Sequence, residues 1–143
     1  MLFSTSLLER PAERRVHLLR YPSACKGEEF RTHMTDTIAM LKAEERPFAV
    51  IHDCRWVRYS QLDLGLPFIE WGKAVSALGH IQRVAFVVDG ARTGKWGLAA
   101  INAALHLSPV QPARIFGSPD EAERWSTSLS ETTASARQRG EST

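Results

Sequence analysis

Cysteine and long apolar runs are both scarce in this chain of 143 residues. The cysteines are Cys25 and Cys54, and a chain with 43% hydrophobic residues can build a core without linking them. We therefore expect reduced thiols and a cytoplasmic protein. The N-terminus lacks the pattern of a signal peptide, and no apolar run approaches the ~20 residues that cross a bilayer, so we expect no membrane span.

An excess of one charge and the usual catalytic motifs are also missing. The net charge is +2, and the lysines and arginines form no one-sided basic stripe, so we expect no nucleic-acid binding. The five histidines show no two-ligand spacing on one helix, and the loop 90–95 has three residues between its glycines where a phosphate loop has four. We therefore expect no metal, no cofactor and no enzymatic activity.

Apolar runs alternate with amphipathic segments along the rest of the chain. The sequence predicts strands at 16–21, 48–53, 83–89 and 110–116, and helices at 27–45, 64–78, 95–107 and 119–128. Residues 2–8 form a further strand or lie over an edge. Short joints between strands and helices give right-handed crossovers and parallel neighbours. We expect an α/β fold with a four- or five-stranded mixed, mostly parallel sheet, covered on both faces by about four helices.

A distinct junction marks the last strand and helix. Ser118 and Glu121 have the spacing of a capping box, and Pro119 occupies the first helical position. Pro112 weakens the preceding strand, which favours a place at the edge of the sheet. The closing unit is therefore predicted to be an edge strand followed by a capped helix.

Polar and aromatic side chains follow the predicted strands at the points where they end. In open α/β sheets, ligands bind beyond the carboxyl ends of the strands. The candidate rim for a ligand or partner consists of Asp53, Arg55, Trp56, Ser60, Asp89, Arg92, Lys95 and Trp96. The structural alternative is that the aspartates cap turns, the arginines are solvated and the tryptophans close the core, because loops always concentrate polar residues.

The predicted helix 95–107 is apolar on almost every side. A helix of this kind is normally buried, whereas a helix that covers a sheet in so small a domain should turn one face to water. Leu98, Ile101 and Leu105 are therefore candidates for an apolar interface with a protein partner or with a second copy of the chain in a homodimer.

Three stretches of the sequence resemble one protein family. They are the apolar run Phe48–Asp53, which ends in aspartate, the run 83–89, and the closing strand and helix in 114–125. Together they resemble the SpoIIAA-like family of small bacterial proteins over roughly residues 14–127. That family shares the STAS fold and is related in shape to CRAL-TRIO lipid-binding domains. The resemblance implies a sheet with helices and no established enzyme activity.

The resemblance also bears on regulation. In phospho-regulated STAS proteins, a serine within an Asp-Ser-Ser/Thr-Gly motif opens the helix after the central strand. The nearest serine in this chain is Ser60, and the stretch 58–63 lacks the glycine of that motif. Ser60 is therefore a poor candidate for a phosphorylation switch.

The residues and the resemblance together favour one STAS-like domain at 1–127 and a disordered tail at 128–143, which has almost no apolar residues. The predicted function is that of a non-catalytic STAS-like regulatory or protein-interaction module that self-associates through helix 95–107. The alternative is a small-molecule or lipid-binding domain with an apolar pocket between helix 95–107 and the sheet.

Overall fold

The computed structural model describes residues 3–8, 15–22, 27–56 and 65–128. The strands are β1 (Ser4–Leu8), β2 (Arg15–Arg20), β3 (Phe48–Asp53), β4 (Ile81–Val87) and β5 (Ala113–Phe116). The helices are α1 (Gly27–Lys42), α2 (Gly65–Ser76), α3 (Gly90–Leu107) and α4 (Pro119–Thr127). The predicted α/β fold, with a mixed and mostly parallel sheet, is confirmed.

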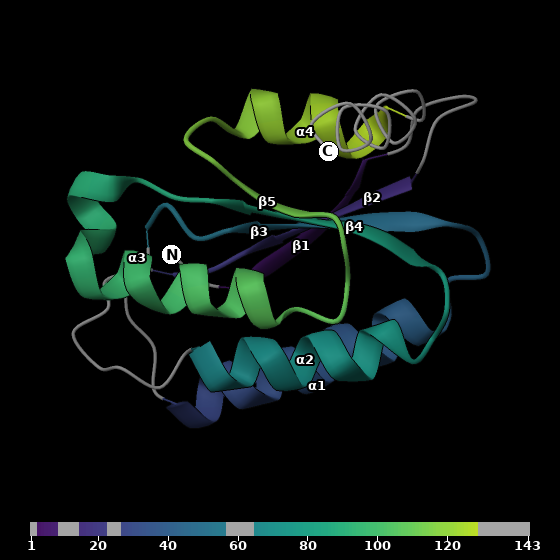
Figure 1. Ribbon diagram of the computed structural model, residues 1–143. Helices are drawn as coiled ribbons and strands as arrows, with labels where there is room; N and C mark the ends of the chain where they lie inside the picture. The colour runs from purple at the N-terminus through teal and green to yellow at the C-terminus, as the bar shows by residue number, and fades with distance from the viewer. Residues whose placement is uncertain (1–2, 9–14, 23–26, 57–64, 129–143) are drawn as a thin grey trace, which may run out of the picture.

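The sheet has five strands in the order β1-β2-β3-β4-β5. β1 runs antiparallel to β2, and the strands from β2 to β5 are parallel neighbours. Each crossover moves one strand further in the same direction, so right-handed crossovers place α1, α2 and α3 on one face. Figure 1 shows these helices on one side of the sheet and α4 on the other. The order of the described strands never reverses, so these strands lack the crevice that a reversal opens in doubly wound folds.

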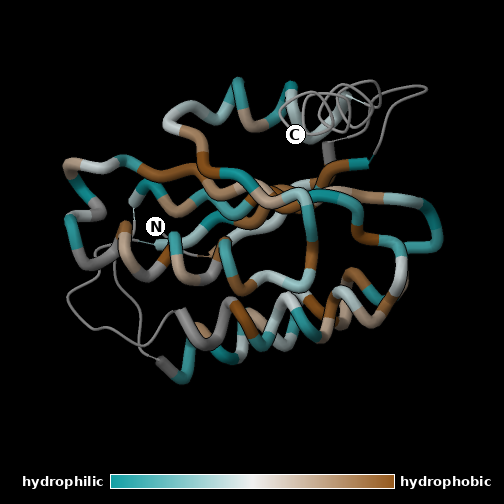
Figure 2. Tube along the Cα trace, viewed as in Figure 1, coloured by the Kyte–Doolittle hydropathy of each residue, from teal (hydrophilic) through white to brown (hydrophobic). Residues whose placement is uncertain are grey.

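The face under α1, α2 and α3 carries the larger core. β3 is buried along its whole length because both of its faces are covered. Phe48 and Val50 of β3 and Phe86 of β4 belong to this core, together with Trp71 of α2 and Ile101 of α3. Figure 2 shows hydrophobic colour concentrated along the sheet, whereas the helices alternate between the two colours, as amphipathic helices do.

The opposite face carries a smaller core under α4. Ile51 and Ala85 of the sheet pack there against Ala122 and Trp125 of α4. The buried guanidinium of Arg83 donates a hydrogen bond to the backbone oxygen of Trp125 and lies 5.2 Å from the centre of its ring. A cation at this position complements the negative end of a helix. Trp125 and Arg83 therefore both help to hold α4 against the sheet.

Most predicted elements agree with the structure to within a few residues. The strand predicted at 48–53 has the bounds of β3, whereas the strand predicted at 110–116 begins only at Ala113. β1 settles the alternative for residues 2–8 in favour of a strand, and β5 takes the predicted place at an edge. Ser128 caps the end of α4, and the rest of the predicted tail lies outside the described residues.

The starts of two helices differ from the prediction. α3 begins at Gly90 because the side chain of Asp89 caps its first turn, and Gly94, with φ of 77°, separates that turn from the long part predicted at 95–107. At the start of α4, Ser118 occupies the N-cap position, but its side chain makes no capping hydrogen bond. The predicted capping box is therefore wrong, although Pro119 opens the helix as expected.

Candidate functional site

The carboxyl ends of the parallel strands lie side by side at one edge of the sheet. Backbone hydrogen bonds continue the pairing past the strand ends, from Tyr21 N to Asp53 O at 3.2 Å and from Cys54 N to Val87 O at 2.8 Å. Figure 1 shows this edge beside the start of α3. The structure thus places the segments that follow β2, β3 and β4 where the sequence predicted a ligand or partner to bind.

Asp53 is the buried centre of this edge. Its side chain is almost fully buried, and its two carboxylate oxygens accept hydrogen bonds from Arg55 Nε at 2.9 Å and from Arg55 Nη2 at 2.8 Å. The hydrogen bonds to Asp53 raise the pKa of the Arg55 guanidinium, and burial opposes them only in part. Arg20 Nε lies 3.9 Å from the same carboxylate. Two guanidinium groups therefore surround one buried carboxylate.

Trp56 extends this cluster toward α3. The guanidinium carbon of Arg92 lies 4.7 Å from the centre of the Trp56 ring, and that of Arg55 lies 5.6 Å from it. Both distances are within the range of cation–π attraction. Arg92 makes no ion pair with a carboxylate of the described residues. We call Arg20, Arg55, Trp56 and Arg92 the cationic rim.

The other predicted rim residues take different places. Asp89 accepts hydrogen bonds from the backbone N–H groups of Ala91 and Arg92 at 3.1 and 3.4 Å, so it caps α3, as the structural alternative held. Lys95 is exposed on α3. Ser60 lies outside the described residues, and the same is true of the Trp96 side chain. Asp53, Arg55, Trp56 and Arg92 are thus the predicted residues that the structure brings together.

The chemically reactive groups near the rim lie beneath it. His52 is fully buried, and its Nδ1 lies 2.6 Å from the hydroxyl of Tyr21. Burial lowers the pKa of His52 from 6.5 to about 3, with a further contribution from His33, so the ring is neutral at neutral pH. Burial also raises the pKa of the Cys54 thiol well above its usual value, and the nearby charge of Asp53 adds to this effect.

The residues predicted to form an apolar interface on α3 face the core. Ile101 is fully buried, and Leu98 and Leu105 are half-buried and pack against the core of the three-helix face. Ile101 therefore belongs to the core, which corrects its prediction as a residue of an apolar interface. The residues of α3 described as exposed beyond Gly94 are Lys95, Ala99, Asn102, Ala103, His106 and Leu107. Among the α3 side chains that the structure describes, Leu98, Ile101 and Leu105 therefore face the core, whereas the exposed ones are small or polar except for Leu107.

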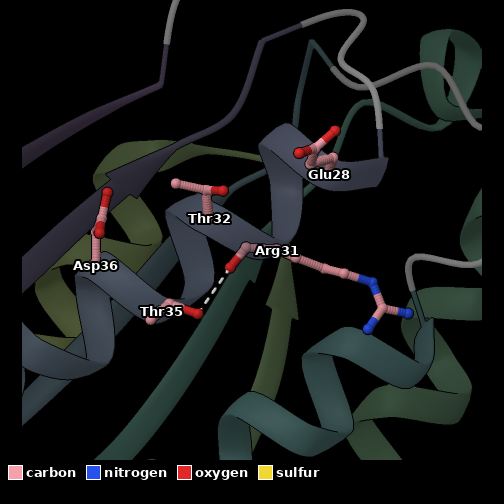
Figure 3. A pocket seen from close by; sticks show the side chains of 5 residues that line it. All are labelled: Glu28, Arg31, Thr32, Thr35 and Asp36. Carbon is pink, nitrogen blue, oxygen red and sulfur yellow. Dashed lines mark hydrogen bonds between the residues drawn. The ribbon is translucent and has the colours of Figure 1, made fainter.

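A hollow of about 530 Å³ lies on the outer side of α1. It is lined by Glu28, Arg31, Thr32, Thr35 and Asp36, and all of them belong to this one helix. In Figure 3, Arg31 extends away from Asp36, so the two charged groups do not converge on one point. The hydroxyl of Thr35 donates within the helix, to the backbone oxygen of Arg31 at 3.0 Å. This geometry does not single out a ligand.

Two polar features of the structure leave no recognisable pattern in the sequence. Arg20 pairs with Asp53 in the register of β2 and β3, a relation that appears only once the strands are aligned. At the amino end of the sheet, Glu44 accepts hydrogen bonds from Arg15 at 3.1 Å and from His17 at 2.9 Å. Burial acts to raise the pKa of Glu44, but the hydrogen bond from His17 and the charge of Arg15 outweigh it and lower the pKa. This second cluster ties β2 to the segment that follows α1.

Comparison of the chain with protein-family models, with curated proteins and with solved structures finds no match. Among the helices that the structure describes, none is long and apolar enough to pass through a membrane. The described His, Cys, Asp and Glu side chains form no group of three that could hold a metal ion. The resemblance to SpoIIAA-like proteins therefore remains a prediction.

Proposed function

We propose that this chain is a non-catalytic, STAS-like interaction module that binds an acidic segment of a partner protein at the cationic rim. The observation that carries the proposal is the state of Arg92, which is stacked on Trp56 at 4.7 Å and has no carboxylate partner among the described residues. Stacking on a ring holds a guanidinium in place while its N–H groups remain able to bind a carboxylate in a bidentate manner.

The charges around the rim favour an anionic partner. Arg20 and Arg55 already neutralise Asp53, and Arg92 adds a further positive charge beside them. Asp89 is close in sequence to Arg92, but its carboxylate is used to cap α3. The rim therefore has more positive than negative charge, which steers acidic groups toward it and excludes basic ones.

We also propose that the chain is not an enzyme, because the chemically reactive side chains beneath the rim are not accessible to a substrate. His52 and Cys54 are fully buried, and the high pKa of Cys54 keeps its thiol protonated. Asp53 is buried and engaged by Arg55 through both oxygens. A general base or nucleophile must reach the atom on which it acts, and these groups are all covered or engaged.

The alternative of a lipid pocket between α3 and the sheet has less support. The space in question is occupied by Ile101, and Leu98 and Leu105 pack against the same core. A lipid chain at this place would have to displace these side chains, and each displaced side chain would lose about 1.5–3 kcal/mol of burial.

Titration with hexaglutamate at low ionic strength tests the proposal, with the indole N–H signal of Trp56 in NMR spectra as the reporter. We expect Arg92→Gln to weaken binding about tenfold, which corresponds to about 1.4 kcal/mol. The binding of the wild-type protein should weaken as salt is added, because exposed charges are screened.

Arg31→Gln is the matched control, because it removes the same charge from an exposed position on α1. This variant should bind hexaglutamate as the wild type does. Equal weakening by Arg31→Gln and Arg92→Gln would show that only the net charge matters, and it would overturn the rim as the binding site. A Trp56 signal that does not move at any peptide concentration would have the same consequence.

A further inference from the structure

The two edges of the sheet differ in how well they are covered. β5 is one edge, it has four residues, and both α3 and α4 pack against it. Pro112 directly precedes it, and its side chains are half-buried. β1 is the other edge, and its extensive contacts are with β2 alone. Short length, a proline and helical cover are among the means by which proteins prevent pairing at a sheet edge; β5 is short and covered, and a proline directly precedes it.

β1, with five residues, is only one residue longer than β5, but it lacks the other means of protection. Its sequence is Ser-Thr-Ser-Leu-Leu, without charge or proline. The side chains of residues 4–7 are exposed, and Leu7, at 40% exposure, is one of two large hydrophobic side chains among the described residues that are exposed. No described strand pairs with its outer side. An uncharged strand of this kind presents a row of backbone groups that a further strand can bind.

We propose that β1 is the interface of a homodimer, in which β1 of a second copy pairs antiparallel with it across a twofold axis. The register that pairs all five residues of both strands is centred on Ser6, because Ser6 is the middle residue of β1. Thr5 then lies opposite Leu7 of the second copy. The dimer keeps the predicted self-association of the chain but moves it from α3 to the edge of the sheet.

A second copy fits this edge because a twofold axis places the strand opposite itself. Like charges directly across a strand pair destabilise it, and β1 has no charge that could meet its own copy. The exposed Leu7 gains a neighbour in Thr5 of the other chain, and the same contact recurs on the other side of the axis. A single pairing of five-residue strands is a small interface, so we expect micromolar rather than nanomolar affinity.

Sedimentation velocity over about 1–500 µM protein measures this association, a range chosen around the micromolar dissociation constants of small interfaces. We expect the wild type to pass from monomer to dimer within this range. The double variant Thr5→Lys, Leu7→Lys places lysines opposite each other in the proposed register and should weaken the dimer at least tenfold, a loss of about 1.4 kcal/mol. Circular dichroism melting shows that the monomer still folds, which is expected because both side chains are exposed.

The register itself is tested by reversing one of the new charges. In Thr5→Lys, Leu7→Glu, each lysine meets a glutamate of the second copy, so dimerisation should recover relative to the double lysine variant. A second control is Ala99→Lys, Ala103→Lys, which adds the same two charges to the exposed face of α3. This control should dimerise as the wild type does.

Each remaining outcome contradicts the proposal. A wild-type protein that stays monomeric up to the highest concentration has no such interface. Loss of the dimer in the α3 variant, with no loss in the double lysine variant of β1, would return the interface to α3. Equal loss in both variants, without recovery in the lysine–glutamate variant, would show general charge repulsion. These results do not depend on the cationic rim, since Arg55, Trp56 and Arg92 are unchanged in every variant.

Discussion

The two faces of the sheet are built from the same strands but differ in the side chains and helices that pack against them. The three-helix face is filled with bulky side chains, among them Phe48, Phe86 and Trp71, and it also buries the polar pair Tyr21 and His52. The α4 face has mostly smaller residues on the strands and is closed by one helix of nine residues. We therefore expect the three-helix face to provide most of the stability and the α4 face to open by itself.

Replacing a tryptophan on each face should give the largest effects. Trp71 and Trp125 are both buried, with 2% and 5% of their surfaces exposed. Trp71→Ala should reduce the free energy of unfolding by about 3–5 kcal/mol, because the cavity lies in the main core. Native-state hydrogen exchange should then be faster in every strand, since unfolding of this face involves the whole sheet.

Trp125→Ala should act locally. Loss of the ring removes the main apolar contact of α4, so the amides of α4 should lose their protection while those of β3 and β4 keep most of theirs. If this variant accelerated exchange in β3 and β4 as much as Trp71→Ala does, the two faces would form one cooperative unit and the comparison would fail.

Lowering the pH should reduce the free energy of unfolding, because the buried histidine of the three-helix face, His52, becomes protonated on unfolding. Folded His52 takes up a proton only near pH 3, whereas the unfolded chain does so near pH 6.5. Between these values the unfolded state binds more protons, so the free energy of unfolding falls as the pH falls, by up to about 1.4 kcal/mol per pH unit. Burial lowers the pKa of His33 more than Asp36 raises it, so His33 contributes with the same sign.

Urea denaturation at pH 6.5 and at pH 5 measures this slope, in a window above the usual pKa of Glu44, 4.5. His52→Phe should reduce the slope, because it removes the group with the most strongly lowered pKa. An unchanged slope in His52→Phe would show that other groups cause the acid sensitivity.

The smallest of these effects concerns one hydrogen bond. Tyr21→Phe removes the hydroxyl that lies 2.6 Å from His52 Nδ1 and should lower the free energy of unfolding by about 1–2 kcal/mol. The ring remains, so its packing against Phe30 should be kept. A variant as stable as the wild type would show that the polar pair contributes nothing to the stability of this face.

Much of the fold could be predicted because local signals agreed with it. Pro47 and the polar segment after Asp53 bound the apolar run of β3, and its predicted limits are those of the structure. The start of α3 was missed because Gly90 and Gly94 suggest a loop, whereas the cap provided by Asp89 is a local detail that turns the first residues into a helical turn. Periodicity alone also does not say which side of α3 faces the sheet, so it allows Ile101 as an interface candidate although the residue lies in the core.

The candidate site was predictable only in outline. Strand ends indicated that Asp53, Arg55, Trp56 and Arg92 lie at one edge, since parallel strands share the direction of their carboxyl ends. The pairing of Asp53 with Arg55 and the stacking of Arg92 on Trp56 depend on side-chain directions that no spacing encodes. The sequence predicts that Arg83 lies in a strand but gives no sign of its partner Trp125, which is 42 residues away.

The order of the strands in the sheet, which is also their order in the chain, has a consequence for biosynthesis. As the polypeptide leaves the ribosome, each described strand after β1 meets a neighbouring strand that has already been made, so none of these strand pairings has to wait for a strand further along the chain. The sheet can therefore grow strand by strand in the direction of translation, and α4 closes its second layer as the last step.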